Sequence, residues 1–541
     1  MTVGNAVKDP NLQSVAIEVA KRCAGLPLLL VAVARALKKR DIYAWKDALE
    51  QLRRFDNDEL DKQVTSALKL SYDSLENEEI KALFLLFGQL GTQRSHMADL
   101  LQYTVGLGLF KRSRTLEEAR NRLHKYASDL LASCLLLEVR NDGFVHIHDL
   151  VCKFAVSLAS RDHQALTLTY DAELKEWPAK DVLEHCTAII LPYRNIPELP
   201  RVLECPKLKL FILCDKDCLL KIPDNFFRGM KELKVLDIGR MDFSPRLPSS
   251  FQFLSNLETL ILYHCVLEDI AIIGELKKLQ VLRFQNSNIV RLPIEVKELT
   301  RLRLLDLSGC ERLQVIPPDV LSRLTQLEDL YMGNSFVQWE GEGHDCPRNN
   351  ANLAELKLLS NLITLEIHIV DVNILPKDLF SEKLERFRIF IGKEWKWSGS
   401  YNTSKTLKLK LNSSIHLDKV KVLLLITENL HLDDLKGVNN VLNELDEQGF
   451  PRLKQLYIQN CLEIQYIIDW MSMSHFNFIA FPRLESLFLG NLNNLETISC
   501  GPPTVGSFGN LTKLKVGNCN RLKNLFSFSM FRELARLEEV D

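Results

Sequence analysis

The sequence lacks the features that would place the chain in a membrane, in the secretory pathway or on nucleic acid. Its longest apolar run, residues 24–37, has 14 residues and includes Pro27 and Arg35, so it is too short to span a bilayer. Residues 1–13 show no charged segment followed by an apolar one, as a secretory signal would. The 68 basic and 70 acidic residues give a net charge of −2, which argues against binding dominated by phosphate contacts. We expect a cytoplasmic protein with no transmembrane segment and no specific nucleic-acid target.

The cysteines also argue against a disulfide framework or a metal site. There are 13, an odd number, and they are scattered along the chain. Cys214 and Cys218 have no second Cys or His pair at zinc-finger distance, and His146 and His148 share a strand face without further ligands. We predict reduced thiols and no metal. The cysteines expected to pack as small buried groups at one position of a repeat are Cys265, Cys310, Cys461 and Cys519.

What the sequence does contain is a recurring phrase, L-x-x-L-x-L-x-x-C, complete at residues 302–310. Equivalent leucines from Leu208 to Leu327 follow at intervals of 25, 24, 22, 23 and 25 residues, the length of one leucine-rich repeat. Beyond Leu327 the intervals become 35, 22, 36, 33, 31 and 27 when Val420 is counted as a repeat start, so the register after about residue 335 is less well defined. The pattern predicts an α/β leucine-rich-repeat solenoid, a horseshoe, over residues 166–541.

The residues before the repeats predict helices. In residues 1–55, Gly25 is a natural helix stop and Pro27 a natural helix start. In residues 56–165, apolar faces of helical period give way to alternating segments that flank Asn-Asp-Gly at 141–143, a hairpin signal. Helices followed by a hairpin predict a winged helix, after which Asp149 is expected to cap a helix from Leu150 to about Ala159. The predicted protein is therefore multidomain, with an all-α helical subdomain and a winged helix before the solenoid.

The order of these motifs resembles that of plant intracellular immune receptors. Gly25-Leu26-Pro27-Leu28, the hairpin segment, Ile147-His148-Asp149 and the repeats follow one another as in the nucleotide-binding leucine-rich-repeat (NB-ARC/LRR) family, most closely its coiled-coil subgroup. In that family a Met-His-Asp motif ends the winged helix, and Ile147 is a conservative departure from it. The resemblance covers essentially all of the chain. It implies that residues 1–55 are the C-terminal helical part of the nucleotide-binding region, and that the protein is a switch with no catalytic residues.

Part of the family pattern is missing. The Walker A loop has the form G-x-x-x-x-G-K-[ST], but the chain's one Gly-Lys pair, Gly392-Lys393, is followed by Glu394. The Walker B strand and the coiled coil are absent as well. We interpret the chain as the later part of a receptor: a fragment, a truncated gene product or a partial gene model. The resemblance implies ADP in the resting receptor and ATP in the active one, but we expect this chain to bind either only weakly or not at all.

The candidate nucleotide contacts lie outside the repeats. His148 precedes a predicted helix, whose first turn offers free N–H groups and the positive end of the helix dipole, which favour a phosphate. The resemblance implies that His148 contacts the terminal phosphate of ADP and that Pro27 packs beside the adenine. Without the resemblance, the same residues are a strand-end histidine and a helix-start proline. The residues that the resemblance assigns to the switch or to capping are Gly25, Leu26, Leu28, Ile147 and Asp149.

The residues between the repeated leucines are predicted to face the concave side of the solenoid. Leu305 and Leu307 should face the core, and Asp306 should face solvent. Aromatic and arginine side chains favour a protein partner, although part of the set would also suit a solvated sheet face. The resemblance implies as partner a pathogen effector or a modified host protein, and self-association on activation. The predicted partner-binding residues are Tyr263, Arg283, Asp306, Tyr331, His368, Arg388, Tyr457, Phe488 and Lys515.

Two other functions stay open at this point. A leucine-rich-repeat adaptor without a nucleotide switch, for example in ubiquitination, would have the repeats but would not need the ordered motifs before them. A winged-helix nucleic-acid regulator would need a basic recognition helix. The basic residues of 116–131 are largely balanced by acidic ones, which disfavours that function.

Overall fold

The computed structural model describes the chain as two compact units. One comprises Met1–Tyr263 with Glu275–Leu282, and the other His264–Gly274 with Arg283–Asp541. Gly25 and Leu26 lie outside the described residues. The described residues are 10–541 except 24–26, 39, 54–59, 92–95, 140–142, 163–164, 168–173, 175, 195–197, 216–219, 342–348, 394–404, 412–413, 447, 473–477, 527–529 and 531–533.

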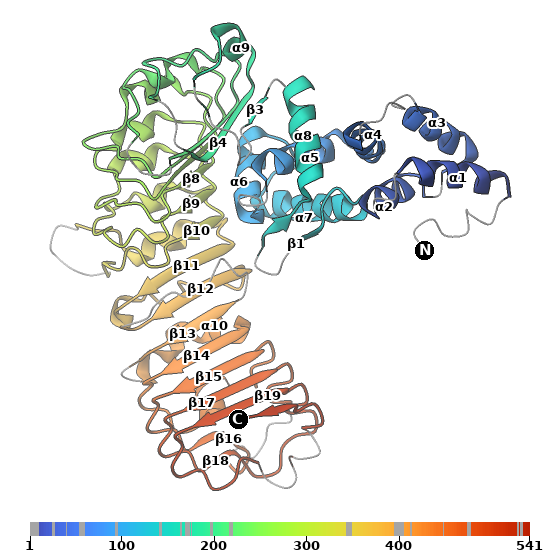
Figure 1. Ribbon diagram of the computed structural model, residues 1–541. Coiled ribbons are helices and arrows are strands. Elements are labelled where there is room, and N and C mark those ends of the chain that lie inside the picture. Colours follow the sequence, from blue (N-terminus) through green and yellow to red (C-terminus); the bar gives the residue numbers. More distant parts are fainter. Residues whose placement is uncertain are drawn as a thin grey trace. The chain divides into compact units, whose positions relative to one another are not determined.

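The first unit begins with helices, drawn in blue in Figure 1. Their apolar faces meet in one core, in which Leu83, Phe84 and Phe87 have no exposed surface. The Asn77 side chain accepts the Glu79 N–H at the start of one helix, and Thr115 accepts the Glu118 N–H at the start of another, as capping residues do. The helices are α1 (Pro10–Arg22), α2 (Pro27–Ala36), α3 (Ile42–Arg53), α4 (Leu60–Asp73), α5 (Glu78–Leu90), α6 (Met97–Leu107) and α7 (Leu116–Ala132).

The predicted hairpin follows these helices. Strands β1 (Glu138–Val139) and β2 (Val145–His146) pair antiparallel, with Glu138 opposite His146. Gly143 has a φ of +86°, a conformation that favours glycine in a tight turn. Helix α8 (Asp149–Asp162) then extends on both sides of the predicted range.

The first unit ends in parallel strands, each paired with its predecessor in the chain. Helix α9 (Lys180–His185) and the 3-10 segments η2 (Phe226–Gly229) and η3 (Ser249–Phe253) lie between strands. Strand β8 (Val281–Arg283) and segment η4 (Ala271–Glu275) fall at the boundary of the two units. The strands are β3 (Ala165–Thr167), β4 (Ala188–Arg194), β5 (Leu210–Asp215), β6 (Val235–Gly239) and β7 (Thr259–Tyr263).

The second unit continues the same pattern, as successive arrows from yellow to red in Figure 1 show. Strands β16 (Tyr466–Asp469) and β18 (Thr497–Cys500) form a separate parallel pair. The main strands are β9 (Leu304–Asp306), β10 (Asp329–Tyr331), β11 (Thr364–Ile369), β12 (Arg386–Ile391), β13 (Thr406–Leu409), β14 (Asn429–Asp433), β15 (Gln455–Gln459), β17 (Ser486–Gly490), β19 (Lys513–Gly517) and β20 (Glu539–Val540). The segments between strands are η5 (Ile294–Glu298), η6 (Leu321–Arg323), η7 (Leu353–Leu358), η8 (Val372–Ile374), η9 (Ser414–Val420), α10 (Lys421–Ile426) and α11 (Val441–Leu445).

The repeated leucines are in register across the strands. Leu305 lies opposite Leu330, which lies opposite Leu365. Leu305 and Leu307 are both fully buried, as the phrase predicts. Because the main strands from β5 to β17 bury the same positions and pair in parallel with their neighbours, the repeats form a leucine-rich-repeat solenoid.

The use of Val420 as a repeat start was wrong. Val420 ends η9, and α10 follows it directly. The strands of this region are β13 and β14 on either side, which bury Leu407 and Leu430 respectively. In the sequence, these two strands appear as the strictly alternating segments Thr-Leu-Lys-Leu and Asn-Leu-His-Leu. Both lack the first leucine of the L-x-x-L-x-L phrase.

The cysteines behave mostly as predicted. Cys265, Cys310 and Cys461 are buried, whereas Cys519 is half-exposed. Burial raises the pKa of the Cys310 and Cys461 thiols to about 12, so both are protonated at neutral pH. Among the described residues, the helices are too short or too polar to cross a membrane.

Replacing Leu305 by alanine should destabilise the solenoid. The side chain is fully buried, so lost burial and the cavity together should cost about 2–5 kcal/mol of unfolding free energy. Urea unfolding measures this, with exposed Arg301→Ala as a control expected within about 0.5 kcal/mol of the parent. Equal effects from the two variants would contradict the leucine register.

Candidate recognition surface

Between the buried leucines, alternate residues of each strand form a second face of the sheet, here called the outward face. In the second unit, one row of this face places Asp306, Tyr331, Glu366 and Arg388 opposite one another on β9 to β12. The parallel register sets these side chains at the same height, about 4.8 Å apart from strand to strand. The sheet therefore displays side chains from distant parts of the sequence as one surface.

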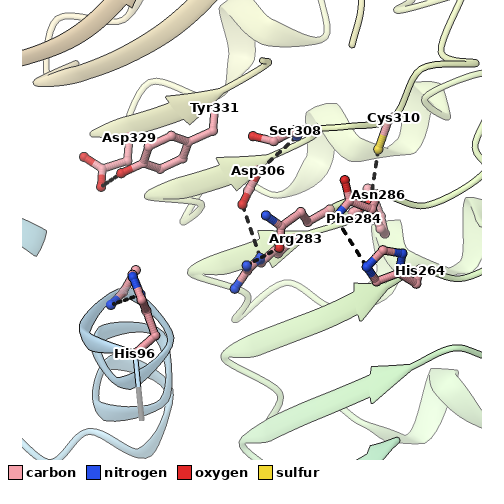
Figure 2. A network of polar contacts seen from close by, with 12 residues as sticks. His96, His264, Arg283, Phe284, Asn286, Asp306, Ser308, Cys310, Asp329 and Tyr331 are labelled. Atoms are coloured by element: carbon pink, nitrogen blue, oxygen red, sulfur yellow. Dashed lines mark hydrogen bonds and ion pairs between the residues drawn. The ribbon is translucent and has the colours of Figure 1, made fainter. Parts of the chain in front are cut away.

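Asp306 does not face solvent, contrary to the prediction. Its carboxylate lies 3.2 Å from Nε of Arg283 on the neighbouring strand, and only 2% of Asp306 is exposed. The Ser308 N–H also donates to this carboxylate at 2.9 Å. Figure 2 shows Arg283 and Asp306 pointing toward each other. The pair stabilises the sheet and leaves Asp306 little surface for a partner.

Three further predicted residues in the second unit make contacts along the outward face. The Tyr331 hydroxyl donates to Asp329 at 3.2 Å and remains half-exposed (Figure 2). Arg388 lies 4.0 Å from the carboxylate of Glu366. Nε2 of His368 lies 2.8 Å from the Gly392 carbonyl oxygen, and burial lowers the pKa of His368 despite this contact.

Tyr263 belongs to a different environment, in the first unit. It packs against Gly239 on β6, where an added Cβ would collide with the tyrosine ring. The apolar outward residues of β5 to β7 join the core that contains α6. The Tyr103 hydroxyl on α6 donates to Asp237, and Thr259 Oγ1 donates to the Gln102 carbonyl at 3.0 Å. This part of the outward face is therefore occupied by the chain's own helix.

His148, rather than Asp149, caps helix α8. Nδ1 of His148 accepts the Leu150 N–H at 3.2 Å, and its carbonyl accepts the Val151 N–H at 2.8 Å. Asp149 is the exposed first residue of the helix, so the predicted role of its side chain as the cap was wrong by one position. Ile147 is buried just before the cap.

The other predicted switch residues give less information. Pro27 begins α2, as expected of a helix-start proline. The side chains of Pro27 and Leu28 lie outside the described part of the structure, so a contact with adenine stays a prediction. Within the described ranges, no group of His, Cys, Asp and Glu side chains is arranged to hold a metal ion.

Toward the end of the chain the outward face becomes aromatic. The rings of Tyr457 and Phe488 stack with centroids 4.2 Å apart and planes 4° from parallel. His431, which the sequence analysis missed because Val420 displaced the register, stacks on Tyr457 at 4.2 Å and 3°. Lys408, missed for the same reason, lies opposite His431. The alternating pattern of β13 and β14 is the signal that could have found both.

These features define a leucine-rich-repeat protein that presents the outward face of a parallel sheet, preceded by helices and a hairpin. Residues 405–541 match the family model of plant disease resistance protein RPS2-like leucine-rich repeats. The Arabidopsis thaliana disease resistance protein At4g27190 is 25% identical over 99% of this chain and 56% of its own length. Probable disease resistance protein At4g27220, also from Arabidopsis thaliana, is 27% identical over 99% of this chain and 59% of its own length.

The homologues of this chain are thus plant disease resistance proteins, which confirms the predicted resemblance. The chain spans 56% and 59% of the length of these two relatives. Among solved structures, an internalin from Listeria monocytogenes matches 69% of this chain and 91% of its own, with 16% identity and a TM-score of 0.38.

Asp306→Ala should be strongly destabilising. It leaves Arg283 without its carboxylate in a site where both side chains are largely buried, which typically costs about 3–5 kcal/mol. The double variant Arg283→Met/Asp306→Leu should recover most of the loss, because it removes both charges. Urea unfolding of the three variants tests this, with exposed Glu311→Ala as the control. A loss below about 0.5 kcal/mol for Asp306→Ala would show that the pair does not hold the sheet.

Glu366 should make stability depend on pH. Burial raises the pKa of its carboxyl from 4.5 to about 7, partly opposed by Arg388. The folded state therefore binds this proton more tightly than the unfolded state, and this contribution to stability falls as pH rises from about 4.5 to about 7.

Glu366→Gln removes the titrating group. Raising the pH from 4.5 to 8 should therefore increase the unfolding free energy of the variant, relative to that of the parent, by about 2–3 kcal/mol. The difference between the two proteins isolates Glu366 from the other carboxyls. A difference that is constant with pH would contradict the raised pKa.

Proposed function

We propose that this chain supplies the helical, winged-helix and leucine-rich-repeat parts of a plant disease resistance receptor. Its repeats recognise a pathogen effector or a modified host protein, and the region before them takes part in an ADP/ATP-controlled switch that triggers defence. The observation that carries the proposal is the extent of its homology, which includes the helical part as well as the repeats. A repeat-only adaptor would account for the outward face but not for the relation of residues 10–162 to these receptors.

The helices and hairpin support the winged-helix assignment. Helices α5, α6 and α7 are followed directly by the β1–β2 hairpin, the order expected of that fold. Arg120 on α7 lies 2.5 Å from Glu117, and Arg122 lies 3.5 Å from Glu79. Because these basic side chains face carboxylates, α7 is poorly suited to DNA, and a switch function fits it better than nucleic-acid recognition.

The capping role of His148 is compatible with a phosphate contact. Since Nδ1 accepts the Leu150 N–H, the N–H that the imidazole can donate is on Nε2. That N–H is a donor of the kind a terminal phosphate of ADP would accept, beside the positive end of α8. The same residue would then start the helix and sense the nucleotide.

The docking of α6 on β6 and β7 supports restraint of the switch by the repeats. The hydrogen bonds of Tyr103 and Thr259 connect the helix to the sheet within the first unit. Gly106 lets the helix approach so closely that an added Cβ would collide with the side chains of Thr259 and Val235. A partner that alters the repeats could therefore act on the switch through this contact.

The isolated chain should bind ADP or ATP weakly or not at all. The phosphate-cradling loop and its lysine, which supply most of the phosphate contacts in such sites, are absent from it. Isothermal calorimetry of the purified chain checks this. A tight one-to-one complex with ADP would mean that other residues build the phosphate site.

His148→Ala, placed in a complete receptor, should cause defence signalling without a pathogen. Loss of a charge-assisted contact to the phosphate should cost the resting state about 1.5–3 kcal/mol. His148→Asn keeps a good capping side chain but shortens the reach to the phosphate, so it should signal as well.

The matched control is His146→Ala, two residues earlier on β2, which should stay silent. Spontaneous cell death in a leaf expression assay is the measurement, with protein accumulation checked alongside. If His148→Asn is silent while His148→Ala signals, the capping role alone explains the effect and the phosphate contact is excluded.

A further inference from the structure

The outward face of β12 to β19 carries a continuous row of flat and cationic side chains. The parallel register places each residue of the row directly opposite the next. We call it the aromatic row; its members are Phe390, Lys408, His431, Tyr457, Phe488 and Lys515.

The central rings of the row form one continuous stack. His431, Tyr457 and Phe488 stack in succession with centroids 4.2 Å apart and planes within 4° of parallel. All three side chains remain half-exposed, so the edges of the stack are open to a ligand. Burial and the neighbouring Lys408 lower the pKa of His431 to about 4, so it is a neutral ring at pH 7.

The two ends of the row differ in charge. At one end, Lys408 Nζ lies 4.6 Å from the centroid of the Phe390 ring. Burial, and to a smaller extent the positive charge of Arg388, lowers the pKa of Lys408. Arg388 itself lies 4.0 Å from the Glu366 carboxyl, whose pKa is raised to about 7, so the positive charge at this end is only partly neutralised at neutral pH. At the other end Lys515 is balanced by Glu539 and Asp541, each 3.3 Å away. An anionic group is thus favoured at the Lys408 end.

A hollow of about 410 Å³ lies beside this stack and is lined by Tyr457, Phe488 and Lys515 together with Gly490 and Gly517. The two glycines occupy outward positions where a side chain would otherwise fill the space. A Cβ on Gly517 would meet no atom within 4 Å, and one on Gly490 would meet only Gln459 Cβ, at 3.8 Å. Packing with neighbouring atoms therefore does not require glycine at either position, and both positions leave the rings accessible from the side.

We propose that the aromatic row is a docking surface for an acidic polypeptide segment that carries an aromatic side chain. The aromatic group enters the hollow against Tyr457 and Phe488, and the carboxylates reach Lys408 and Arg388. The inference rests on the proposed recognition function and names the chemistry of the partner. Single-stranded RNA is disfavoured, because it carries a phosphate at every nucleotide, whereas Asp433, Glu539 and Asp541 place carboxylates beside Lys410 and Lys515.

The sheet also sets the spacing within the partner. Lys408 on β13 and Phe488 on β17 are three strand intervals apart, about 14 Å at about 4.8 Å each. An extended chain covers about 3.3 Å per residue, so the acidic and aromatic residues of the partner should be about four residues apart.

The test uses the full chain and fluorescent peptides with a Glu-Glu pair and a Trp, separated by one to six Gly or Ser residues. Fluorescence anisotropy should show the tightest binding near a spacing of about four. Lys408→Glu and Tyr457→Ala should each weaken the best peptide about tenfold or more. Gly517→Leu should do the same by filling the hollow while the melting temperature stays unchanged.

Matched control variants lie off the row on the same unit. Lys421→Glu reverses an exposed charge on α10, and Val505→Leu enlarges a side chain that is 78% exposed; both should bind like the parent. The proposal is overturned if binding is independent of spacing, if Gly517→Leu binds as well as the parent, or if no peptide binds at millimolar concentration. Tighter binding of a single-stranded RNA oligonucleotide than of every peptide would also overturn it.

Failure of this proposal can be told apart from failure of the recognition function. In a complete receptor, Lys408→Glu and Gly517→Leu should abolish the response to the activating partner while His148→Asn remains spontaneously active. If the peptides fail but these row variants still abolish the response, the surface recognises its partner and the acidic-aromatic chemistry is wrong. If the row variants also respond normally, the docking surface itself is excluded.

Discussion

The parallel pairing of strands that bury the same leucine positions is the constraint on which the rest of the structure depends. Each strand is held by its neighbours through main-chain hydrogen bonds and by a continuous layer of side chains such as Leu305, Leu330 and Leu365. Because this layer fixes the register, it also fixes the height and spacing of every outward residue. On the proposed function, recognition then depends on exposed outward residues that contribute little to the leucine core, so these residues can change without changing the fold.

The outward face is used in different ways along the chain. In the first unit its apolar residues on β5 to β7 accept helix α6. In the second unit, Arg283 and Asp306 hold neighbouring strands together, whereas Tyr457 and Phe488 stack and stay half-exposed. Composition at the outward positions follows these uses: apolar residues pack against the chain's own helix, paired charges stabilise the sheet, and, on our proposal, aromatic residues beside glycines form a surface for a partner.

The sequence predicted the features that local pattern controls. The leucine phrase gave the buried positions of β9 to β11, and Asn-Asp-Gly gave the β1–β2 hairpin. The incorrect predictions, those for Asp306 and Val420, have physical causes. Burial of Asp306 depends on Arg283 one repeat earlier, which period-two reasoning on a single strand cannot show. Val420 lies in an apolar stretch that suits a helix as well as a strand, and it displaced the register that would have found Lys408 and His431.

The central claim is that the outward face of the later repeats recognises the partner of a disease resistance receptor. Hydroxyl-radical footprinting of a complete receptor, with and without its activating partner, tests this most directly. Oxidation of Tyr457 and Phe488 should fall when the partner binds, while Met471, 72% exposed and outside the main strands, should be unaffected. Protection of Met471 with unchanged oxidation of the two rings would contradict the account.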